Sequence, residues 1–265
     1  AISMVHAPNP TSEVWTAIGW NGTSSLLAAD LHFNRLIRHS KILGITLPSD
    51  FFKIVFEKII NIETPEKMNF NELQTPFIVK VTITSNGDIS LLPRSNKVWR
   101  DLPLNAISMS MPDISTPILG TKHASWHHYL NAIEQAKING ADLSLLFSNN
   151  FLIDGDRCTP VILDNDGVAY YPKNSDGALD SVTLEQLRQE IEISGIPIRE
   201  KKISLDMIMR SSEMIVLGSG IGVGSIGKID GTIIGKPKGK LFQIAKKAWL
   251  NRLKLDWMSI EDMGE

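Results

Sequence analysis

The sequence predicts a mixed α/β protein of the α+β class, in which short strands are joined mostly by hairpins. Short apolar runs end at turn dipeptides such as Asn21-Gly22 and Asn86-Gly87. Helical patterns end at glycines, among them Gly44, Gly140 and Gly195. Several strands follow one another directly along the chain, which argues against a doubly wound parallel sheet. The length of 265 residues leaves room for two domains.

Residues 1–112 are expected to form a small α/β domain. An extended lead-in precedes two strands and two helices, and a hairpin follows them. The expected ranges are strands 14–20 and 24–29, helices 31–43 and 49–61, and hairpin strands 77–85 and 88–93. Residues 98–121 contain Pro103, Pro112 and Pro117 and show little periodicity, so we expect them to connect the two domains.

Residues 113–265 are expected to form a larger domain. Thr183 and Gln186 have the spacing of a capping box at a helix start. Asp230-Gly231 predicts a hairpin turn after the glycine-rich segment. The expected ranges are helix 125–139, strands 143–147, 150–154, 160–163 and 168–171, helix 183–193, strand 198–203, helix 205–210, strand 214–217 and helix 240–256.

Composition limits the classes of function. A net charge of −2 gives no electrostatic reason to expect a nucleic acid or an anionic membrane as partner. The single cysteine, Cys158, excludes an internal disulfide and is typical of a reducing compartment, so we expect a cytoplasmic protein without a membrane segment. His123, His127 and His128 cluster, but no second ligand group follows at a zinc-like interval, so no metal is expected.

A buried strand at 214–217 leads into a glycine-rich stretch that predicts a phosphate-binding loop. Residues 222–227 match G-x-G-x-x-G, and residues 222–228 match the first seven positions of a P-loop. Both nucleotide motifs require a helix directly after the glycines, whereas a hairpin is expected here. Ile229 also lacks the hydroxyl that a P-loop provides for magnesium. A nucleotide site is therefore disfavoured.

Three residues far apart in the sequence are candidates for one anion-binding, imine-forming site. Arg35 adjoins an apolar helix face, from which a guanidinium group can hold a phosphate. Lys122 stands in a neutral, apolar segment, where desolvation would lower the pKa of its amine. Asp154 ends an apolar strand and could face a cation. From spacing alone, a solvated helix charge, a surface lysine and a turn carboxylate are the simpler interpretations.

Four segments match one family pattern in their order and spacing. They are His32-Phe-Asn-Arg35-Leu36 with Ser40 and Leu43, Lys122 before the helix at 125–139, Asp154-Gly155 with Cys158-Thr159, and 213–219 with Ile229-Asp230-Gly231. These segments resemble the class IV aminotransferases, the fold-type IV enzymes that use pyridoxal 5'-phosphate (PLP). That family includes branched-chain and D-amino-acid aminotransferases and 4-amino-4-deoxychorismate lyase. The resemblance covers roughly residues 14–240 and implies a two-domain fold like that of D-amino-acid aminotransferase.

The resemblance implies a role for each matching residue. Lys122 would hold PLP as a Schiff base and move the proton of the substrate, and Asp154 would face the pyridine nitrogen. Arg35 would bind the phosphate together with the loop after the strand at 214–217. The remaining cofactor-binding residues implied by the resemblance are Cys158, Thr159, Ala178, Leu179, Gly218, Ser219 and Gly220.

Several positions depart from the family pattern. Asp154 stands in place of Glu and is one methylene shorter, and Leu179 lacks the hydroxyl of the usual Thr, which Ser181 or Thr183 could supply instead. Asp180 stands where the family usually has Arg, which puts a negative charge near the phosphate site. Cys158-Thr159 replaces Ser-Asn, and Ser225 replaces the usual Pro.

The first functional hypothesis is a PLP-dependent aminotransferase that acts on an amino acid and a 2-oxo acid. A 4-amino-4-deoxychorismate lyase, which would eliminate pyruvate with the same lysine, is the alternative. A degenerate PLP-binding relative is a third interpretation, motivated by the departures above. The resemblance also implies a homodimer and a small-molecule partner, either an amino acid or aminodeoxychorismate. Candidate pocket-lining residues, chosen by position alone, are Arg94, Arg100, Trp126 and His127.

Overall fold

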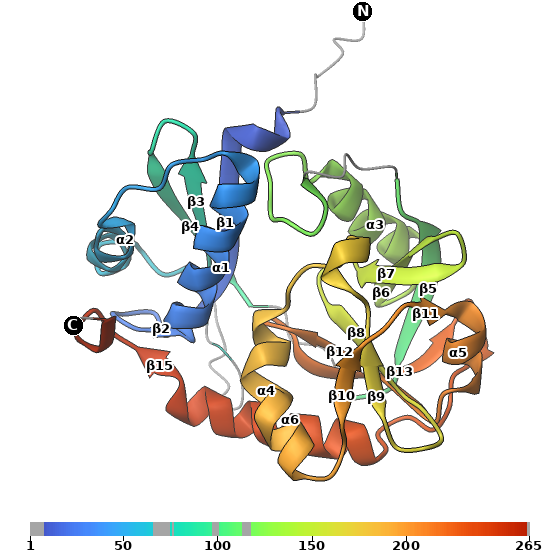
Figure 1. Cartoon of the computed structure of the whole chain (residues 1–265). Coiled ribbons are helices and arrows are strands. Elements are labelled where there is room, and N and C mark those ends of the chain that lie inside the picture. The colour runs from blue at the N-terminus through green and yellow to red at the C-terminus, as the bar shows by residue number, and fades with distance from the viewer. Residues whose placement is uncertain (1–7, 66–74, 76, 97–100, 113–117, 264–265) are drawn as a thin grey trace, which may run out of the picture.

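The chain folds around two sheets, with helices on their outer faces (Figure 1). The structure is a computed structural model, and it describes residues 8–65, 75, 77–96, 101–112 and 118–263. The α+β class is confirmed, because hairpin-linked strands dominate both sheets. The smaller sheet lies at the left of Figure 1 and the larger sheet at the right.

The smaller sheet has five strands in the order β15-β2-β1-β3-β4. Helix α1 covers it with a C-cap at Gly44 in the left-handed region, as the sequence predicts. Phe33, Leu36 and Phe56 pack with the inward residues of β1 and β3 into one apolar cluster. The elements of this part are β1 (Glu13–Trp20), β2 (Leu26–Leu27), α1 (Ala29–Leu43), α2 (Phe51–Ile59), β3 (Phe77–Thr84) and β4 (Ile89–Ser95).

The end of the chain returns to this first sheet. Helix α6 (Lys240–Leu255) crosses the molecule along the bottom of Figure 1, and β15 (Trp257–Met258) then pairs with β2. The backbone N–H of Ala28 also donates to the carbonyl of Asp256 at 2.8 Å. The two ends of the described chain therefore contribute to the same sheet, an arrangement that local sequence patterns cannot indicate.

The larger sheet has ten strands, nine of them in the order β10-β9-β8-β12-β13-β5-β6-β7-β11, with β14 paired to β13. Most neighbours are antiparallel, while β13–β5, β5–β6 and β10–β9 are parallel. The strands are β5 (Leu104–Ser110), β6 (Leu143–Ser148), β7 (Phe151–Gly155), β8 (Thr159–Leu163), β9 (Ala169–Tyr171), β10 (Ile198–Glu200), β11 (Ile203–Ser204), β12 (Glu213–Gly218), β13 (Gly222–Ile229) and β14 (Thr232–Ile233).

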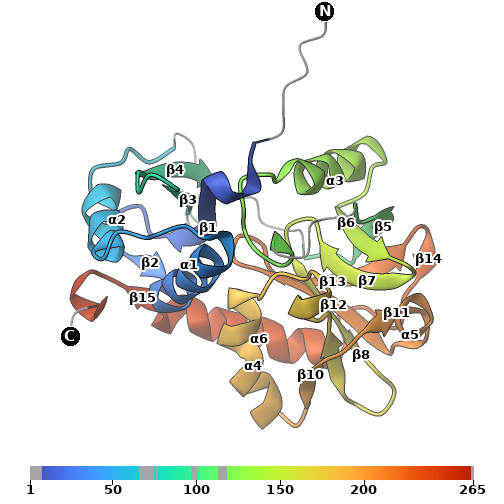
Figure 2. The same ribbon diagram turned by 45° about the horizontal axis from the view of Figure 1, so that its top comes forward.

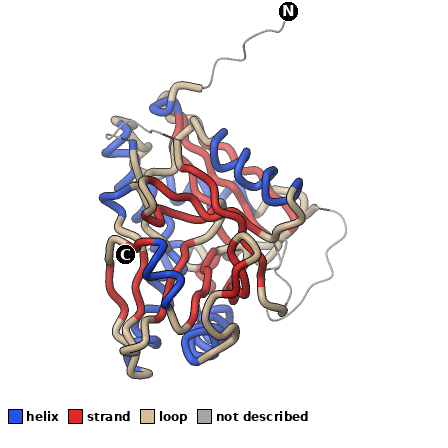
Figure 3. The backbone as a smooth tube through the Cα atoms, turned by 90° about the vertical axis from the view of Figure 1, so that its right-hand side faces the viewer, coloured by secondary structure: helices blue, strands red, loops and turns tan. Residues whose placement is uncertain are grey.

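The strand expected at 198–203 is two strands, which lie on opposite edges of this sheet. β10 pairs with β9 at one edge, and β11 pairs with β7 at the other. Only residues 201–202 separate them, so the sheet must curl until its two edges lie close together. Figure 3 shows the strands of the chain in red and the helices around them in blue. The expectation of one continuous strand was therefore wrong, because the first part of the segment pairs with one edge of the sheet and the last part with the other.

The expectation that residues 98–121 form only a connection was also wrong. β5 lies within them and pairs in parallel with both β13 and β6, in the interior of the strand order. Its residues Leu104 and Ala106 are buried while Asn105 is exposed, which is the alternation of a half-buried strand. Since β5 joins the second sheet and β15 the first, the sheets do not follow the boundary at residues 112 and 113. That boundary stays a prediction.

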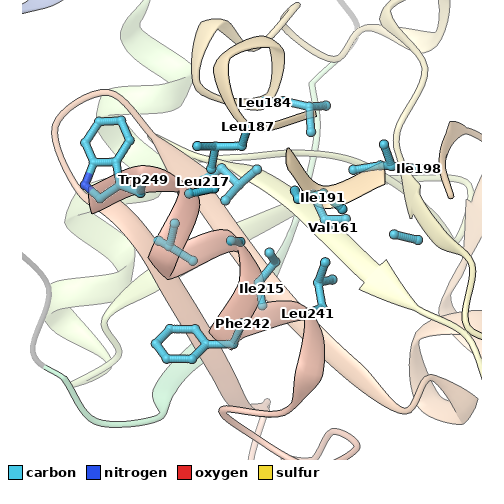
Figure 4. Close-up of a cluster of buried hydrophobic side chains, with 14 of the residues drawn as sticks. Val161, Leu184, Leu187, Ile191, Ile198, Ile215, Leu217, Leu241, Phe242 and Trp249 are labelled. Atoms are coloured by element: carbon cyan, nitrogen blue, oxygen red, sulfur yellow. The ribbon is translucent and has the colours of Figure 1, made fainter. Parts of the chain in front are cut away.

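Helices α4 (Val182–Ile193) and α6 pack together against β8 and β12 to form a second apolar cluster (Figure 4). The N-cap of α4 is Ser181, whose hydroxyl accepts the N–H of Leu184 at 3.1 Å, and not the predicted Thr183. The helix begins earlier than the apolar pattern suggested, so Thr183 lies within its first turn, where it is buried. The remaining helices are α3 (His127–Ile138), seen above the larger sheet in Figure 2, and α5 (Leu205–Arg210).

The glycine-rich stretch forms a hairpin of β12 and β13 and is not followed by a helix. Residues 222–227, which mimic nucleotide motifs, lie within β13. A Cβ atom added at Gly222 would lie 2.6 Å from Nε1 of Trp249, so this glycine serves close packing against α6. The predicted turn at Asp230-Gly231 is confirmed by positive φ angles at both residues.

Candidate active site

Lys122 lies between β5 and α3 along the chain, next to β1 of the smaller sheet. Its main chain is held on both sides: the carbonyl accepts the N–H of Trp15 on β1 at 3.2 Å, and the N–H donates to Nδ1 of His39 on α1 at 3.1 Å. Its Nζ lies 3.9 Å from the ring centroid of Trp15 and 4.9 Å from that of Trp126. The two indoles meet edge to face, and the amine lies against both rings.

Burial lowers the pKa of the Lys122 amine well below its ordinary value. The charge of Arg35 lowers this pKa further, and the carboxylates of Asp154 and Asp180 oppose the shift. A larger share of the amine is therefore unprotonated at neutral pH than for a surface lysine, and an unprotonated amine can act as nucleophile or base.

Gly120 brings the lysine segment against the loop that precedes α4. Its φ is +70°, and an added Cβ would lie 2.6 Å from Nδ2 of Asn174 and 2.8 Å from the carbonyl of Ala178. Asn174 donates from that nitrogen to Ala178 O at 2.6 Å. A side chain at position 120 would push these two segments apart, so the position of Lys122 depends on glycine here.

Asp154 is buried, with 2% of its surface exposed, at the end of β7. Its Oδ2 accepts the hydroxyl of Tyr129 at 2.9 Å and the N–H of Leu179 at 3.2 Å, and Oδ1 accepts the N–H of Gly155 at 3.0 Å. Burial raises the pKa of Asp154 to about 7, although these hydrogen bonds and the charge of Lys122 oppose the rise. A carboxyl group with such a pKa can hold or release a proton near neutral pH.

Arg35 is buried, which excludes the interpretation as a solvated helix charge. Its guanidinium group donates to the carbonyl of Asp180 at 3.0 Å and to Oγ1 of Thr16 at 2.9 Å. Burial lowers its pKa to about 10, which leaves the group charged at neutral pH. Its Nε is buried without an acceptor among the described residues, so one donor remains free for an anionic ligand.

The side of α1 that faces the site carries His32 and His39 in addition to Arg35. These residues are spaced by three and four positions, which places them on one helix face. His32 and Arg35 belong to the motif noted in the sequence, and the four-residue interval to His39 places a third polar residue on the same face. Burial, followed by the charges of Arg35 and Lys122, lowers the pKa of His32 well below its ordinary value. His32 Nδ1 lies 2.8 Å from Oγ1 of Thr16, which extends the polar network to β1.

The turn at Gly218-Ser219-Gly220 faces this helix. Oγ of Ser219 lies 3.5 Å from Nε2 of His32 and 3.5 Å from Oγ1 of Thr183, distances at the limit of a hydrogen bond. A Cβ at Gly218 would lie 3.0 Å from the carbonyl of Arg157, and one at Gly220 would lie 3.4 Å from Oδ1 of Asn96. Arg35 and Ser219 are thus linked through the short polar network of Thr16 and His32.

The other predicted cofactor-binding residues have diverse surroundings. The N–H of Leu179 donates to Asp154, and the neighbouring Ala178 is buried. Cys158 is buried in an apolar cluster, and burial raises the pKa of its thiol well above the ordinary value. Thr159 begins β8 and lines a cavity together with Leu179 and Asp180.

That cavity has a volume of about 440 Å³ and lies between α1, α4 and β9. Arg38, Asn174, Leu179 and Asp180 are among its lining residues, but Lys122, Asp154 and Arg35 are not. The cavity therefore shares the Leu179–Asp180 segment with the candidate site but not its three reactive groups. The titratable groups with shifted pKa values gather around Lys122, so the candidate active site is described there.

The predicted pocket-lining residues are only partly brought together. Trp126 adjoins the amine of Lys122, and the charge of Arg94 is one of the influences that lower the pKa of that amine, after burial and Arg35. His127 is exposed at the start of α3 and contacts Ser125. Arg100 lies outside the described residues. In the described ranges, no group of three or more His, Cys, Asp or Glu side chains is placed to bind a metal.

Two residues at the centre of the site, His39 and Tyr129, were not predicted as functional. Tyr129 lies within the helix expected at 125–139; its hydroxyl bonds to Asp154 and its ring stacks on Trp126 at 4.0 Å between centroids. Burial, followed by the nearby charge of Asp154, raises the pKa of Tyr129 well above its ordinary value, so the hydroxyl stays protonated and donates.

The profile of the family "Amino-transferase class IV" matches residues 13–229. The chain belongs to the class IV aminotransferases. This family consists of PLP-dependent enzymes with the fold of type IV, and its members include aminotransferases and related lyases. The matched range includes Arg35, Lys122, Asp154 and Ser219. The resemblance found in the sequence is thereby confirmed at the level of the family.

Individual relatives are distant. The "Probable branched-chain-amino-acid aminotransferase" of Rickettsia felis is 23% identical over 209 residues, which is 75% of this chain and 71% of the relative. The branched-chain aminotransferase of Thermoproteus uzoniensis, solved with norvaline, has a TM-score of 0.74 at 19% identity, covering 94% of this chain and 90% of its own. The "Putative 4-amino-4-deoxychorismate lyase" of Legionella pneumophila also has a TM-score of 0.74, at 18% identity, with coverages of 94% and 97%. Because both structures are below 25% identity, they show the fold alone.

Within the part of the chain that the structure describes, no helix has the length and apolar character needed to cross a membrane.

Proposed function

We propose that this protein is a PLP-dependent aminotransferase that exchanges an amino group between an amino acid and a 2-oxo acid, with Lys122 as the residue that binds the cofactor. The observation that carries the proposal is the desolvated amine of Lys122, whose pKa responds to Arg35 and to Asp154. These three residues are separated by at least 32 positions in the sequence, yet they act on one another in the fold.

The donors around Lys122 fit PLP chemically. Arg35 offers a charged group with an unpartnered Nε to a phosphate, and Ser219 and Thr183 offer hydroxyl groups. Asp154 offers a buried carboxyl group suited to a protonated ring nitrogen. The N–H of Leu179, expected at the phosphate, instead bonds to Asp154 in this structure. Bound PLP supplies an electron sink for the electrons released at the substrate Cα.

The protein groups then have distinct tasks. Nζ of Lys122 removes the proton from the substrate Cα, because its lowered pKa leaves it unprotonated more often than a surface amine. Tyr129 and the N–H of Gly155 orient the carboxylate of Asp154, and a cationic partner would lower the pKa of Asp154 from about 7 and keep it ionised. The indoles of Trp15 and Trp126 exclude water around the amine.

Purified protein tests the proposal by its absorbance with added PLP. We expect a cofactor band that borohydride removes, with the mass of the reduced adduct on the peptide that contains Lys122. Lys122→Ala should lack the band, whereas Lys137→Ala should keep it, because Lys137 is exposed and paired with Glu134. Absence of the band in the unmodified chain would contradict PLP binding altogether.

The reaction type is tested separately. Amino-group transfer that depends on a 2-oxo acid supports the aminotransferase, and pyruvate release from aminodeoxychorismate supports the lyase instead. PLP binding with neither activity would identify a non-catalytic relative. The homodimer and the cytoplasmic location stay predictions, and sedimentation of the purified chain tests the former.

A further inference from the structure

Asp180 connects the loop before α4 to three residues of α1. Its carbonyl accepts from Arg35 at 3.0 Å, its Oδ2 accepts from Arg38 at 2.6 and 3.1 Å, and its Oδ1 lies 2.7 Å from Nε2 of His39. Burial would raise the pKa of Asp180, but the hydrogen bonds from His39 and Arg38 and the charge of Arg35 lower it below the ordinary value. Asp180 is therefore ionised at neutral pH and serves α1 as an acceptor.

His39 transmits this contact to the lysine segment. Its Nδ1 faces the main-chain N–H of Lys122 at 3.1 Å, and an N–H can only donate. Nδ1 must therefore carry the lone pair, and the proton of the neutral ring must lie on Nε2, which donates to Asp180. Burial lowers the pKa of His39 although Asp180 opposes the shift, so the ring is neutral near pH 7.

Among the described residues, the main-chain N–H of Lys122 has one hydrogen-bond acceptor, Nδ1 of His39. The carbonyl of the same residue bonds to Trp15, and the side chain of His39 is 3% exposed. If the imidazole held its proton on Nδ1, two donors would face each other and the N–H of Lys122 would lose its acceptor. The tautomer of His39 therefore decides whether the backbone of Lys122 is fixed.

We propose that His39 and Asp180 are positioning residues for Lys122: Asp180 holds His39 in the tautomer that accepts the main-chain N–H of Lys122. The pair thus places the amine between the indoles of Trp15 and Trp126 without touching the reacting atoms. This role gives a reason for Asp180 at a position where the resemblance to the family implies Arg. Its carboxylate accepts hydrogen bonds from side chains of α1, so it does not place an unpaired negative charge at the phosphate site.

The first test uses isotope-labelled full-length protein and two observables, the nitrogen resonances of the His39 ring and the hydrogen exchange of the Lys122 amide. In Asp180→Asn, the amide oxygen should stay with the two donors of Arg38, which turns the NH2 group toward Nε2 of His39. We expect the ring proton to move to Nδ1 and the Lys122 amide to exchange about five- to tenfold faster.

Replacements of His39 separate the hydrogen bond from general packing. His39→Asn keeps an oxygen near the position of Nδ1 and should keep the slow exchange of Lys122, whereas His39→Leu fills the space without an acceptor and should lose it. Arg38→Gln is the matched control for Asp180. It removes the exposed ion pair but leaves the carboxylate for His39, so both observables should stay as in the unmodified chain.

A second readout rests on the proposed aminotransferase activity. Displacement of the lysine should lower kcat of Asp180→Asn and His39→Leu by about ten- to a hundredfold with little change in KM, and His39→Asn should recover part of the loss. The resonance and exchange measurements do not depend on activity, so a failure of the proposed function leaves them interpretable. An unchanged ring tautomer in Asp180→Asn, or unchanged Lys122 exchange in His39→Leu, would overturn the proposal.

Discussion

Replacement of Asp154 by Asn should stabilise the cofactor-free protein at alkaline pH. Asp154 is 2% exposed, and its pKa is raised from 3.8 to about 7, with burial as the largest cause. A folded-state pKa above the unfolded value means that folding is favoured most below pH 4. This advantage is lost as the pH rises toward 7, because the unfolded chain ionises freely and the folded chain does not.

The magnitude follows from the two pKa values. The full difference, from 3.8 to about 7, corresponds to about 4 kcal/mol of unfolding free energy. Between pH 5 and pH 8.5, about 2.5 kcal/mol of it should be lost, since part has already gone at pH 5. The amide introduced by Asp154→Asn does not titrate, although its NH2 group would face the N–H of Gly155 at a cost that is the same at every pH.

Urea unfolding of both proteins at several pH values, without cofactor, measures this effect. The unfolding free energy of Asp154→Asn minus that of the unmodified chain should grow by about 2.5 kcal/mol from pH 5 to pH 8.5. Titrating groups that do not interact with Asp154 are common to both proteins and cancel, whereas Lys122 adds a contribution of its own because its pKa responds to Asp154. A difference that stays flat across this range would refute the raised pKa. The variant should also bind PLP less well, because it lacks the carboxylate that would face the protonated ring nitrogen. The carboxyl group of Asp154 is thus retained for function at a cost in stability.

Three further predictions concern single side chains. Tyr129→Phe removes a donor to the ionised carboxyl group of Asp154, so the pKa measured from the pH dependence of unfolding should rise by about 1 to 2 units. Gly120→Ala should destabilise by about 2 kcal/mol or more in thermal unfolding, against about 1 kcal/mol for Gly140→Ala, because both have positive φ but only the former would meet neighbouring atoms. Glu213→Gln should cost about 2 to 3 kcal/mol in urea unfolding, because this buried carboxylate accepts two N–H groups of the first turn of α6 at 2.7 and 2.9 Å, and an equal stability would contradict its capping role.

Local sequence patterns predicted most elements of the fold. The Asn86-Gly87 and Asp230-Gly231 turns, the end of α1 at Gly44 and the course of α6 follow from properties of a few adjacent residues. Two of the failures share one cause, which is pairing with distant strands. β5 was obscured by its flanking prolines, and the division between β10 and β11 arises only because two edges of one sheet meet there.

The candidate site was predicted in part. Arg35, Lys122 and Asp154 stand out once their motifs are taken in order, but spacing alone favoured ordinary surface roles for them. The structure decides the matter through burial, which shifts the pKa of all three. Their protein partners were missed because a hydroxyl or an imidazole on a helix has no signature until its neighbour is known.

Neighbouring residues specify the type of most elements, the positions of the turns and the family motifs around Lys122. The hydrogen bonds from the N–H of Lys122 to His39, 83 positions away, and from Tyr129 to Asp154 arise only in the folded chain. The physical reason is that desolvation and hydrogen-bond partnership belong to a place in the folded molecule and not to a residue type. The same amine would be an ordinary surface lysine without the contacts that enclose it.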